Sequence, residues 1–377
     1  MNSPTIVILG GYGRTGSAIA RLLLQHTEAN LVIAGRNGFR IDSLCRQLNH
    51  AFPGGRVNGV RADAAVASSL NQAFLGANLV VVASSTARYA DRVALACLEA
   101  NCDYIDVQYS AEKIAALKAL GPEIERQHRC FLTDAGFHPG VPAALVRFVA
   151  PFFDRLTSAT VASILNPQGG LPCTGGADEL VHEMGEFRSV FFRNGVWQKT
   201  RWNHSEDLPK VAFEAPFGEK VCTPMFLEEM AYLPERFPSL RETGFAIAGF
   251  NPVTDYLVLP LIYAGAKILP GATHALAGAL AWSTRTFDQP PFGNVLHLEA
   301  HGEREGLRES ATLTLFHHDA YQFTAIPVVA TILQWQREPH RVGLFLAAHF
   351  VEPTPFLKDM ERFGLRISGS HWVGSRK

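Results

Sequence analysis

The 377-residue sequence lacks any run of basic residues and carries almost no net charge, with 34 Lys and Arg against 35 Asp and Glu. A polyanionic partner such as nucleic acid therefore finds no general electrostatic attraction. Charged residues are scarce, at 18%, whereas hydrophobic residues reach 47%, which is typical of a globular chain. Because this length exceeds what one hydrophobic core usually organises, we predict two domains.

The sequence also lacks cysteine pairs with the spacing of a metal or redox site. We expect most of the cysteines to be buried thiols in a reducing cytoplasm. The segments His182-Glu183 and His317-His318-Asp319 have neither H-E-x-x-H nor a comparable ligand spacing, so we predict no metal site. The six cysteines are Cys45, Cys97, Cys102, Cys130, Cys173 and Cys222.

An uninterrupted apolar run of membrane-spanning length is absent as well. Residues 256–282 are strongly apolar and long enough to cross a bilayer. However, Lys267 lies near the middle of this segment, and Pro260 and Pro270 interrupt it. Because a charge inside a membrane is costly, we expect a buried helix or a helix at a subunit interface, and no integral membrane segment.

Residues 1–150 do contain a regular alternation of short apolar runs with helical patterns. This order predicts an α/β domain with a Rossmann doubly wound parallel sheet. Residues 79–83 form an unbroken apolar run, as expected for a central strand. The expected strands are 5–9, 31–34, 57–60, 79–83, 104–107 and 130–133, and the expected helices begin near Thr15 and cover 39–48, 90–100 and 111–129, with a break at Gly121-Pro122.

Beyond residue 151 the alternation changes to an α+β pattern. We predict a dinucleotide-binding domain over 1–150 and an α+β substrate or dimerisation domain over 151–339. Two late strands resemble a hairpin with a charged turn at 302–309. The expected strands are 156–165, segments near Val196 and Val211, 295–301 and 311–316, and the expected helices are 178–190, 324–335 and 356–363.

A glycine loop, Gly10-Gly11-Tyr12-Gly13-Arg14-Thr15-Gly16, lies between the first expected strand and the first expected helix, with the spacing G-x-G-x-x-G. The first glycine of this pattern permits a tight turn, the second lets the backbone approach a pyrophosphate, and the third lets helix and strand pack closely. The free N–H groups and the dipole of the helix N-terminus favour an anion there. We therefore predict a dinucleotide site formed by Gly11, Tyr12, Gly13, Arg14, Thr15 and Gly16.

The residues after the second strand indicate which dinucleotide is preferred. An NAD site usually has Asp or Glu there, but this chain has Ala34-Gly35-Arg36-Asn37, with no carboxylate. A guanidinium can bind a 2′-phosphate with two hydrogen bonds and stack on adenine, and Arg40 could add a second positive charge. We predict NADP(H) rather than NAD(H), with Arg36 and Asn37 in the site; the alternative is that Arg36 is a solvated loop residue.

Polar residues after the third and fourth strands extend the predicted cofactor site. Asp63 occupies a position that often meets adenine, although an aspartate there can equally be a helix N-cap. Ser84 and Ser85 lie at the carboxyl edge of the sheet, where ligands bind in open α/β folds. These hydroxyls could reach the pyrophosphate or the nicotinamide ribose, or they could cap the next helix.

These motifs resemble the saccharopine dehydrogenase family. The resemblance rests on the glycine loop, on Ala34-Gly35-Arg36, on residues 97–106 (CLEANCDYID) and on residues 135–140 (AGFHPG), and it continues more weakly to the end of the chain. It implies an N-terminal Rossmann domain, a second α+β domain and a C-terminal segment, about 340–377, that returns towards the first. It also implies hydride transfer between a nicotinamide and the C–N bond of a substituted amino acid, and a homodimer.

Hydride transfer requires one group that moves a proton to or from the substrate nitrogen. Asp106, Tyr109 and His138 are the ionisable or phenolic residues at the expected active edge, and we predict them as catalytic candidates. An ordinary histidine pKa suits proton exchange near neutral pH. The family often has Asp where this chain has His138. Alternatively, His138 only fixes its loop and Asp106 only caps the following turn.

The leading hypothesis is an NADP(H)-dependent oxidoreductase that acts on an amino-acid-derived imine or secondary amine. Within enzymes, the alternative is reduction of a carbonyl or enoyl group. The alternative of another class is a non-catalytic nucleotide-binding protein that contacts a lipid surface through residues 256–282.

Overall fold

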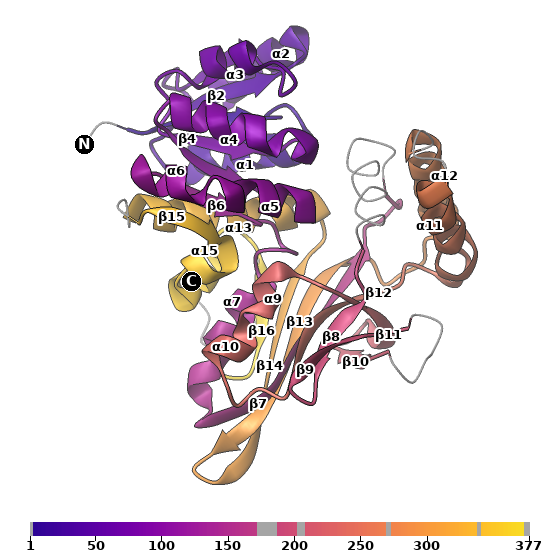
Figure 1. The fold of residues 1–377 in the computed structure, drawn as a ribbon. Coiled ribbons are helices and arrows are strands. Elements are labelled where there is room, and N and C mark those ends of the chain that lie inside the picture. Colours follow the sequence, from indigo (N-terminus) through magenta and orange to yellow (C-terminus); the bar gives the residue numbers. More distant parts are fainter. Residues whose placement is uncertain (1–2, 172–186, 202–207, 269–272, 338–340, 373–377) are drawn as a thin grey trace. The chain divides into compact units, whose positions relative to one another are not determined.

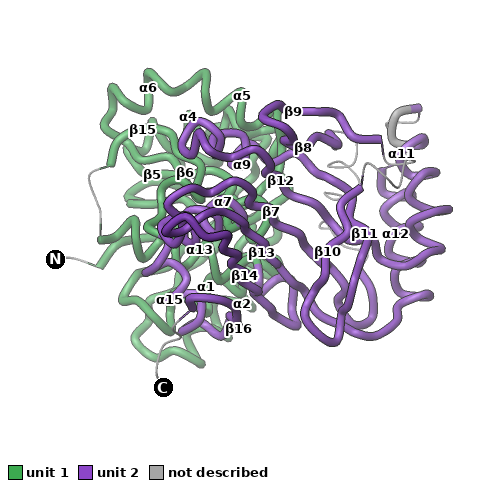
Figure 2. Tube along the Cα trace, turned by 90° about the horizontal axis from the view of Figure 1, so that it is seen from below, with its two compact units in different colours: residues 1–141, 324–352 green, residues 142–323, 353–377 purple. Residues whose placement is uncertain are grey.

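The computed structural model describes residues 3–171, 187–201, 208–268, 273–337 and 341–372 (Figure 1). The chain forms two compact units (Figure 2). Unit 1 consists of residues 1–141 and 324–352, and unit 2 consists of residues 142–323 and 353–377. The chain therefore passes from unit 1 to unit 2 between Val141 and Pro142, and the sequence-based domain boundaries at 150 and 340 remain predictions.

Unit 1 contains a parallel sheet of seven strands, which confirms the Rossmann prediction. The first six strands have the order 3-2-1-4-5-6 of a doubly wound dinucleotide fold, and a late strand is added beside β6. Side chains of Leu79–Val82 are all buried, as expected for a strand covered on both faces. From one edge to the other the strands are β15 (Gly343–Leu346), β6 (Cys130–Thr133), β5 (Asp103–Asp106), β4 (Leu79–Val82), β1 (Thr5–Leu9), β2 (Asn30–Gly35) and β3 (Val57–Arg61).

The helices of unit 1 follow the apolar periodicity of the sequence. Ile19, Leu22 and Leu23 are buried on one face of the first helix. The expected break at Gly121-Pro122 is confirmed, because a new helix begins there with proline in its first turn, where the missing N–H costs nothing. The helices are α1 (Arg14–His26), α2 (Gly38–Ala51), α3 (Ala67–Phe74), η1 (Ala87–Tyr89), α4 (Ala90–Glu99), α5 (Ala111–Ala119), α6 (Gly121–Arg126), most of α13 (Ala320–Arg337) and α14 (Ala347–Phe350).

Unit 2 contains a mixed sheet, in which β12 and β7 are parallel and the other pairs are antiparallel. The predicted hairpin is confirmed but longer, since Glu303 pairs with Arg308 where a charged turn was expected. Charged residues tolerate this exposed two-stranded extension because their side chains remain in water. In spatial order the strands are β10 (Lys210–Phe213), β11 (Gly218–Met225), β12 (Glu242–Ala248), β7 (Arg155–Asn166), β13 (Gly293–Arg304), β14 (Leu307–His317) and β16 (Arg366–Gly369), with β8 (Val190–Arg193) and β9 (Val196–Lys199) attached to β12.

The helices of unit 2 include one buried element that the sequence analysis missed. All eight side chains of Pro142–Val149 are buried, so this helix has no polar face to reveal its period. Of the expected helix at 178–190, residues 178–186 lie outside the described residues, and the rest is not helical, since 187–189 are irregular and Val190 begins β8. The helices are α7 (Pro142–Val149), η2 (Ala150–Phe152), α9 (Glu228–Ala231), α10 (Leu233–Arg236), η4 (Thr254–Val258), α11 (Leu259–Ile268), α12 (Thr273–Thr286) and α15 (Pro353–Arg362).

The apolar segment 256–282 is not one buried helix, contrary to the first of the two expectations. It forms parts of η4, α11 and α12, and Figure 1 shows α11 and α12 side by side. Val258, Ile262 and Leu280 are buried between these helices, but Tyr256 is 80% exposed and Ile268 75% exposed. Within the described residues, none of the helices combines the length and apolarity that a bilayer crossing requires.

Candidate functional site

The glycine loop is packed so tightly that a Cβ atom would clash at Gly16 and would be crowded at Gly13. A Cβ atom on Gly16 would lie 2.4 Å from the carbonyl oxygen of Gly10 and 2.7 Å from the Cα of Gly11. A Cβ on Gly13 would lie 3.1 Å from the same carbonyl oxygen, which also accepts a hydrogen bond from the Gly13 N–H at 2.8 Å. The turn therefore brings the start of α1 directly against the end of β1.

Gly10 connects this loop to the neighbouring strand β4. Its φ of +84° suits glycine, and a Cβ there would lie 2.6 Å from the Cβ of Ser84. Because β1 pairs with β4 and with β2, the loop lies where the strand order reverses, which is where open α/β sheets bind ligands. Ser84 Oγ also lies 3.1 Å from Thr86 Oγ1, so its hydroxyl takes part in the turn that precedes η1.

The N-terminus of α1 has the features of an anion site. Gly13 is its N-cap, and no described side chain forms a capping bond with it or places a carboxylate in the first turn. The first N–H groups of a helix and its dipole carry partial positive charge. A pyrophosphate fits this cradle, because the glycines leave its approach free of Cβ atoms.

Three arginines lie around the carboxyl ends of β2 and β3. Arg36 directly follows β2, and Arg61 ends β3 opposite Gly35. The Arg61 side chain lies beside the start of α2, because a Cβ on Gly38 would be 3.6 Å from its Cδ. The guanidinium of Arg40 lies 5.9 Å from the ring centroid of Tyr12, which packs against Gly35. Arg36 and Arg61 form no ion pair with any described residue.

Arg61 was missed by the sequence analysis. The sequence did contain a feature that could have identified Arg61. A basic residue at the end of β3 lies beside the end of β2 when the strands have the order 3-2-1. Asn37, predicted to bind cofactor, caps α2 by accepting the Arg40 N–H at 3.1 Å. Asp63 does not cap α3, whose N-cap is Val66; its carboxylate accepts the Ala65 N–H at 2.9 Å in the preceding turn.

Asp106 lies in a buried charge network that the sequence analysis did not foresee. The side chains of Asp106 and Lys113 are fully buried, and Lys113 Nζ lies 2.6 Å from Asp106 Oδ1 and 2.7 Å from Asp134 Oδ1. Asp106 also accepts hydrogen bonds from the Thr133 hydroxyl at 2.8 Å and from the Gln108 N–H at 3.1 Å. These contacts support the alternative in which Asp106 caps the turn after β5.

Lys113 remains charged in this network. Burial alone would lower the pKa of Lys113, but the carboxylates of Asp106 and Asp134 outweigh burial and raise it. The sequence feature that could have indicated a buried lysine is the position of Lys113, four residues before Leu117 on the apolar face of α5. Because β5 and β6 are parallel neighbours, Lys113 ties their carboxyl ends together at the ligand-binding edge of the sheet.

The loop 134–140, which follows β6, is closely folded against itself. Asp134 has a φ of +58°, and a Cβ on Gly140 would lie 2.4 Å from the Gly136 carbonyl oxygen. His138 stacks near Phe137, with ring centroids 3.9 Å apart, and its Nε2 is shielded from solvent. Burial lowers the pKa of His138 to about 4, so its imidazole is neutral at pH 7. Tyr109 lies between β5 and α5 and is partly exposed.

This depressed pKa predicts an acid-sensitive stability. Protonation of His138 favours the unfolded chain, where the pKa is near 6.5, so we expect stability to fall as the pH falls from about 6.5 to about 4. His138→Gln cannot be protonated, and its urea midpoint should change less between pH 7 and pH 5. His50→Gln, at an exposed histidine on α2, is the matched control. Equal pH dependence in the wild type and His138→Gln would contradict the prediction.

A metal centre is not assembled by the described residues, among which no group of three or more His, Cys, Asp or Glu side chains could hold an ion. His317 Nδ1 contacts the backbone of Asp319 at 2.9 Å, so this histidine caps the turn after β14. His182-Glu183 lies outside the described residues. The described cysteines are free, and burial raises the pKa of Cys130 and of Cys222 to about 12.

Comparison with known proteins gives a family-model match for the N-terminal part and a similar fold for the whole chain. The saccharopine dehydrogenase NADP binding domain matches residues 6–131. No curated protein sequence matches. An apo saccharopine dehydrogenase (L-Glu forming) from Saccharomyces cerevisiae is 12% identical over 98% of this chain and 99% of its own, with a TM-score of 0.70. At this identity the likeness shows the fold alone.

A DAP dehydrogenase from C. glutamicum, in complex with DAP, is 13% identical over 94% of this chain and 96% of its own, with a TM-score of 0.47. That score is too low to carry an argument. The resemblance seen in the sequence is confirmed: residues 6–131 match the model of the saccharopine dehydrogenase NADP binding domain, and the fold of the chain is similar to that of a saccharopine dehydrogenase.

Proposed function

We propose that this protein is an NADP(H)-dependent oxidoreductase that acts on the C–N bond of an amino-acid-derived imine or secondary amine. The observation that carries the proposal is the presence of the glycine cradle and the three arginines at one edge of a single parallel sheet. Assembly as a homodimer and a cytoplasmic location belong to the same proposal.

The cofactor part of the proposal rests on charge and shape. Backbone N–H groups at the start of α1 would bind the pyrophosphate, and Tyr12 beside Gly35 would lie near the adenosine. Arg36, with Arg61 and Arg40 nearby, would bind the 2′-phosphate that distinguishes NADP(H) from NAD(H). A carboxylate in that place would instead repel the phosphate.

The reaction part rests on the residues at the carboxyl ends of β5 and β6. Bound NADP(H) supplies or accepts the hydride. In the oxidative direction the substrate carbon loses a hydride and its nitrogen loses a proton as the C=N bond forms. His138 is one candidate for accepting that proton; because burial lowers its pKa to about 4, it would be a weak base that holds the proton only transiently. Tyr109 is the second candidate for proton transfer, and Lys113 and Asp106 would hold this edge rigid.

A steady-state screen with NADPH tests the reaction class. Pairs of 2-oxo acids and amines, including 2-oxo acids with lysine, should consume NADPH and form secondary amines that mass spectrometry can identify. If only enones or simple carbonyl compounds led to consumption of NADPH, the protein would instead be a reductase of carbonyl or enoyl groups. Tight NADPH binding without turnover, together with flotation on liposomes, would favour a non-catalytic protein at a lipid surface.

Arginine substitutions test the cofactor preference. We expect Arg36→Ala and Arg61→Ala each to weaken NADPH binding by about tenfold or more, since a charge-assisted hydrogen bond contributes about 1.5–3 kcal/mol. NADH binding should change by less than about twofold, because NADH lacks the 2′-phosphate. Calorimetry with both cofactors provides the measurement, and Arg21→Ala, at a partly exposed arginine of α1 outside this cluster, is the control. Equal losses for NADPH and NADH would exclude the 2′-phosphate role.

A further inference from the structure

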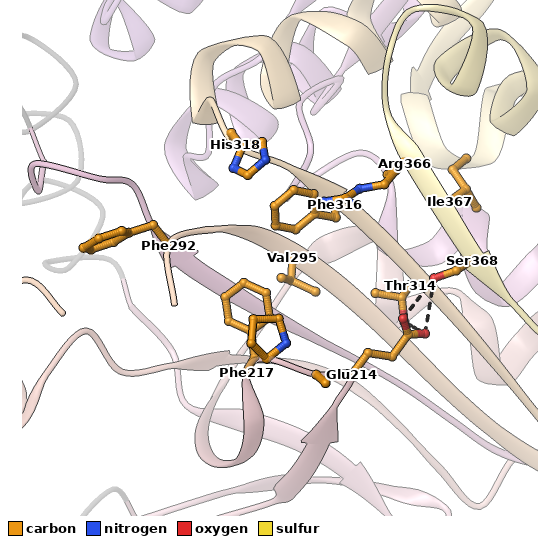
Figure 3. Close-up of a pocket in the computed structure, with 12 residues that line it drawn as sticks. Glu214, Phe217, Phe292, Val295, Thr314, Phe316, His318, Arg366, Ile367 and Ser368 are labelled. Atoms are coloured by element: carbon orange, nitrogen blue, oxygen red, sulfur yellow. Dashed lines mark hydrogen bonds between the residues drawn. The ribbon is translucent and has the colours of Figure 1, made fainter. Parts of the chain in front are cut away.

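Unit 2 contains a pocket of about 370 Å³ on one face of its sheet (Figure 3). It is lined by the β10–β11 turn, by β13 and β14, and by the last strand, β16. All of its lining residues belong to unit 2, and none takes part in the nucleotide site. The pocket therefore requires an explanation of its own.

The middle of the pocket is apolar and aromatic. The ring centroids of Phe217 and Phe316 lie 6.2 Å apart with tilted ring planes, and Val295 lies beside Phe217 in Figure 3. Phe292 adds a third aromatic side chain to the lining. Rings arranged in this way favour an aromatic or branched apolar group of a ligand, which they would remove from water.

One end of the pocket carries a fixed negative charge. The carboxylate of Glu214 accepts hydrogen bonds from the Thr314 hydroxyl at 2.8 Å and from the Ser368 hydroxyl at 3.1 Å (Figure 3). Thr314 Oγ1 also lies 2.9 Å from Nδ1 of the buried His297. Because the threonine donates its proton to Glu214, His297 donates its own to the threonine. This series of hydrogen bonds orients the Glu214 carboxylate. No described cation forms an ion pair with it.

A positive charge lies further along the same strands. The guanidinium of Arg366 lies over the ring of Phe316, 4.4 Å from its centroid. Arg366 pairs in register with Phe316, and Ser368 pairs with Thr314. Arg366 and Ser368 are therefore about 7 Å apart along β16, and no ion pair joins Arg366 to Glu214. Arg366 forms no ion pair with any described residue.

We propose that this pocket binds a small zwitterion that carries an aromatic or branched apolar group, such as an α-amino acid of that kind. Its ammonium group would bind Glu214, its carboxylate would form a bidentate pair with Arg366, and its apolar group would pack against Phe217 and Phe316. An α-amino acid carries its ammonium, carboxylate and apolar groups on one carbon, so the three groups would diverge towards Glu214, Arg366 and the aromatic rings. The inference does not rest on the proposed function.

Isothermal calorimetry with three probes tests the ligand chemistry on the wild-type protein. L-Phenylalanine should bind at least about tenfold more tightly than 3-phenylpropionate, which lacks the ammonium group, or 2-phenylethylamine, which lacks the carboxylate. Glycine, which lacks the apolar group, should bind weakest. Equal affinity for the three aromatic probes would overturn the proposal. So would the absence of L-phenylalanine binding up to about 10 mM, because a Kd above that concentration means a binding free energy of less than about 3 kcal/mol.

Two variants locate the binding on the protein. Arg366→Gln and Glu214→Gln should each weaken the binding of L-phenylalanine by about tenfold. Arg308→Gln, at an exposed arginine elsewhere on β14, should bind L-phenylalanine like the wild type. Unchanged binding in both pocket variants would place the ligand elsewhere. Circular dichroism checks their folding, and the probe series on the wild type does not depend on it. NADPH affinity, measured separately, distinguishes failure of this inference from failure of the nucleotide site.

Discussion

Gly16→Ala should lower the affinity for NADPH by about a hundredfold or more. The added methyl group would lie 2.4 Å from the Gly10 carbonyl oxygen and 2.7 Å from the Gly11 Cα, and all of these atoms belong to backbone that cannot swing aside. Overpacking of this kind costs about 1–3 kcal/mol and moves the loop away from the start of α1. The N–H groups that would bind the pyrophosphate would then point away from it. Fluorescence titration with NADPH measures the loss.

Gly121→Ala is the matched control for this substitution. A Cβ on Gly121 meets nothing within 4 Å, and the residue begins a helix of the same unit. Its affinity for NADPH should equal that of the wild type. If Gly16→Ala bound NADPH within about twofold of the wild type, the glycine loop would not be the pyrophosphate site.

Lys113→Met should destabilise unit 1 by about 3–5 kcal/mol. The methionine has a similar volume, but it leaves the buried carboxylates of Asp106 and Asp134 without the ammonium group that lies 2.6 and 2.7 Å from them. An uncompensated buried charge carries a penalty of this size. Urea unfolding followed by circular dichroism at pH 7 measures the change, and Lys118→Met, at an exposed lysine of the same helix, should lie within about 0.5 kcal/mol of the wild type.

Acid should reduce the defect of Lys113→Met. Without the lysine, repulsion and burial raise the pKa of the carboxyl pair in the folded variant above that of the unfolded chain. The folded variant then binds protons more readily, so its stability relative to the wild type increases as the pH falls through the raised pKa. The triple variant Lys113→Met, Asp106→Asn, Asp134→Asn should recover part of the loss at pH 7. A defect that is independent of pH, with no recovery in the triple variant, would mean that packing rather than charge dominates.

The sequence predicts which residues of the proposed cofactor site lie together, because these residues are close to one another along the chain. The loop of residues 10–16 lies between one strand and one helix, and Arg36 follows the next strand, so the parallel order alone brings them to one edge. Arg61 needed one further inference, that β3 lies beside β2. Asn37 shows the limit of this reasoning, because the structure gives it the role of a helix cap, whereas its contact with the cofactor stays a prediction.

The reacting edge was harder to predict because its contacts depend on burial. Asp106 and His138 were identified as polar residues at strand ends, but the sequence does not state that Lys113 turns inward from α5 to meet Asp106 and Asp134. Likewise, the ordinary pKa of histidine suggested proton exchange at pH 7, whereas burial lowers the pKa of His138 to about 4. Desolvation depends on the atoms packed around a group, and those come from distant parts of the chain.

The sequence by itself determined the Rossmann unit, its glycine loop and the cationic end of its second strand, because local hydrophobic periodicity and turn chemistry specify strands, helices and their parallel order. Only the tertiary structure decided that residues 256–282 form parts of η4, α11 and α12 with both buried and exposed apolar side chains. It also decided that three charges meet inside unit 1, and that β10, β14 and β16 bring Glu214 near Thr314 and Ser368. Such arrangements join residues far apart along the chain, and their energies come from burial and pairing that no short segment contains.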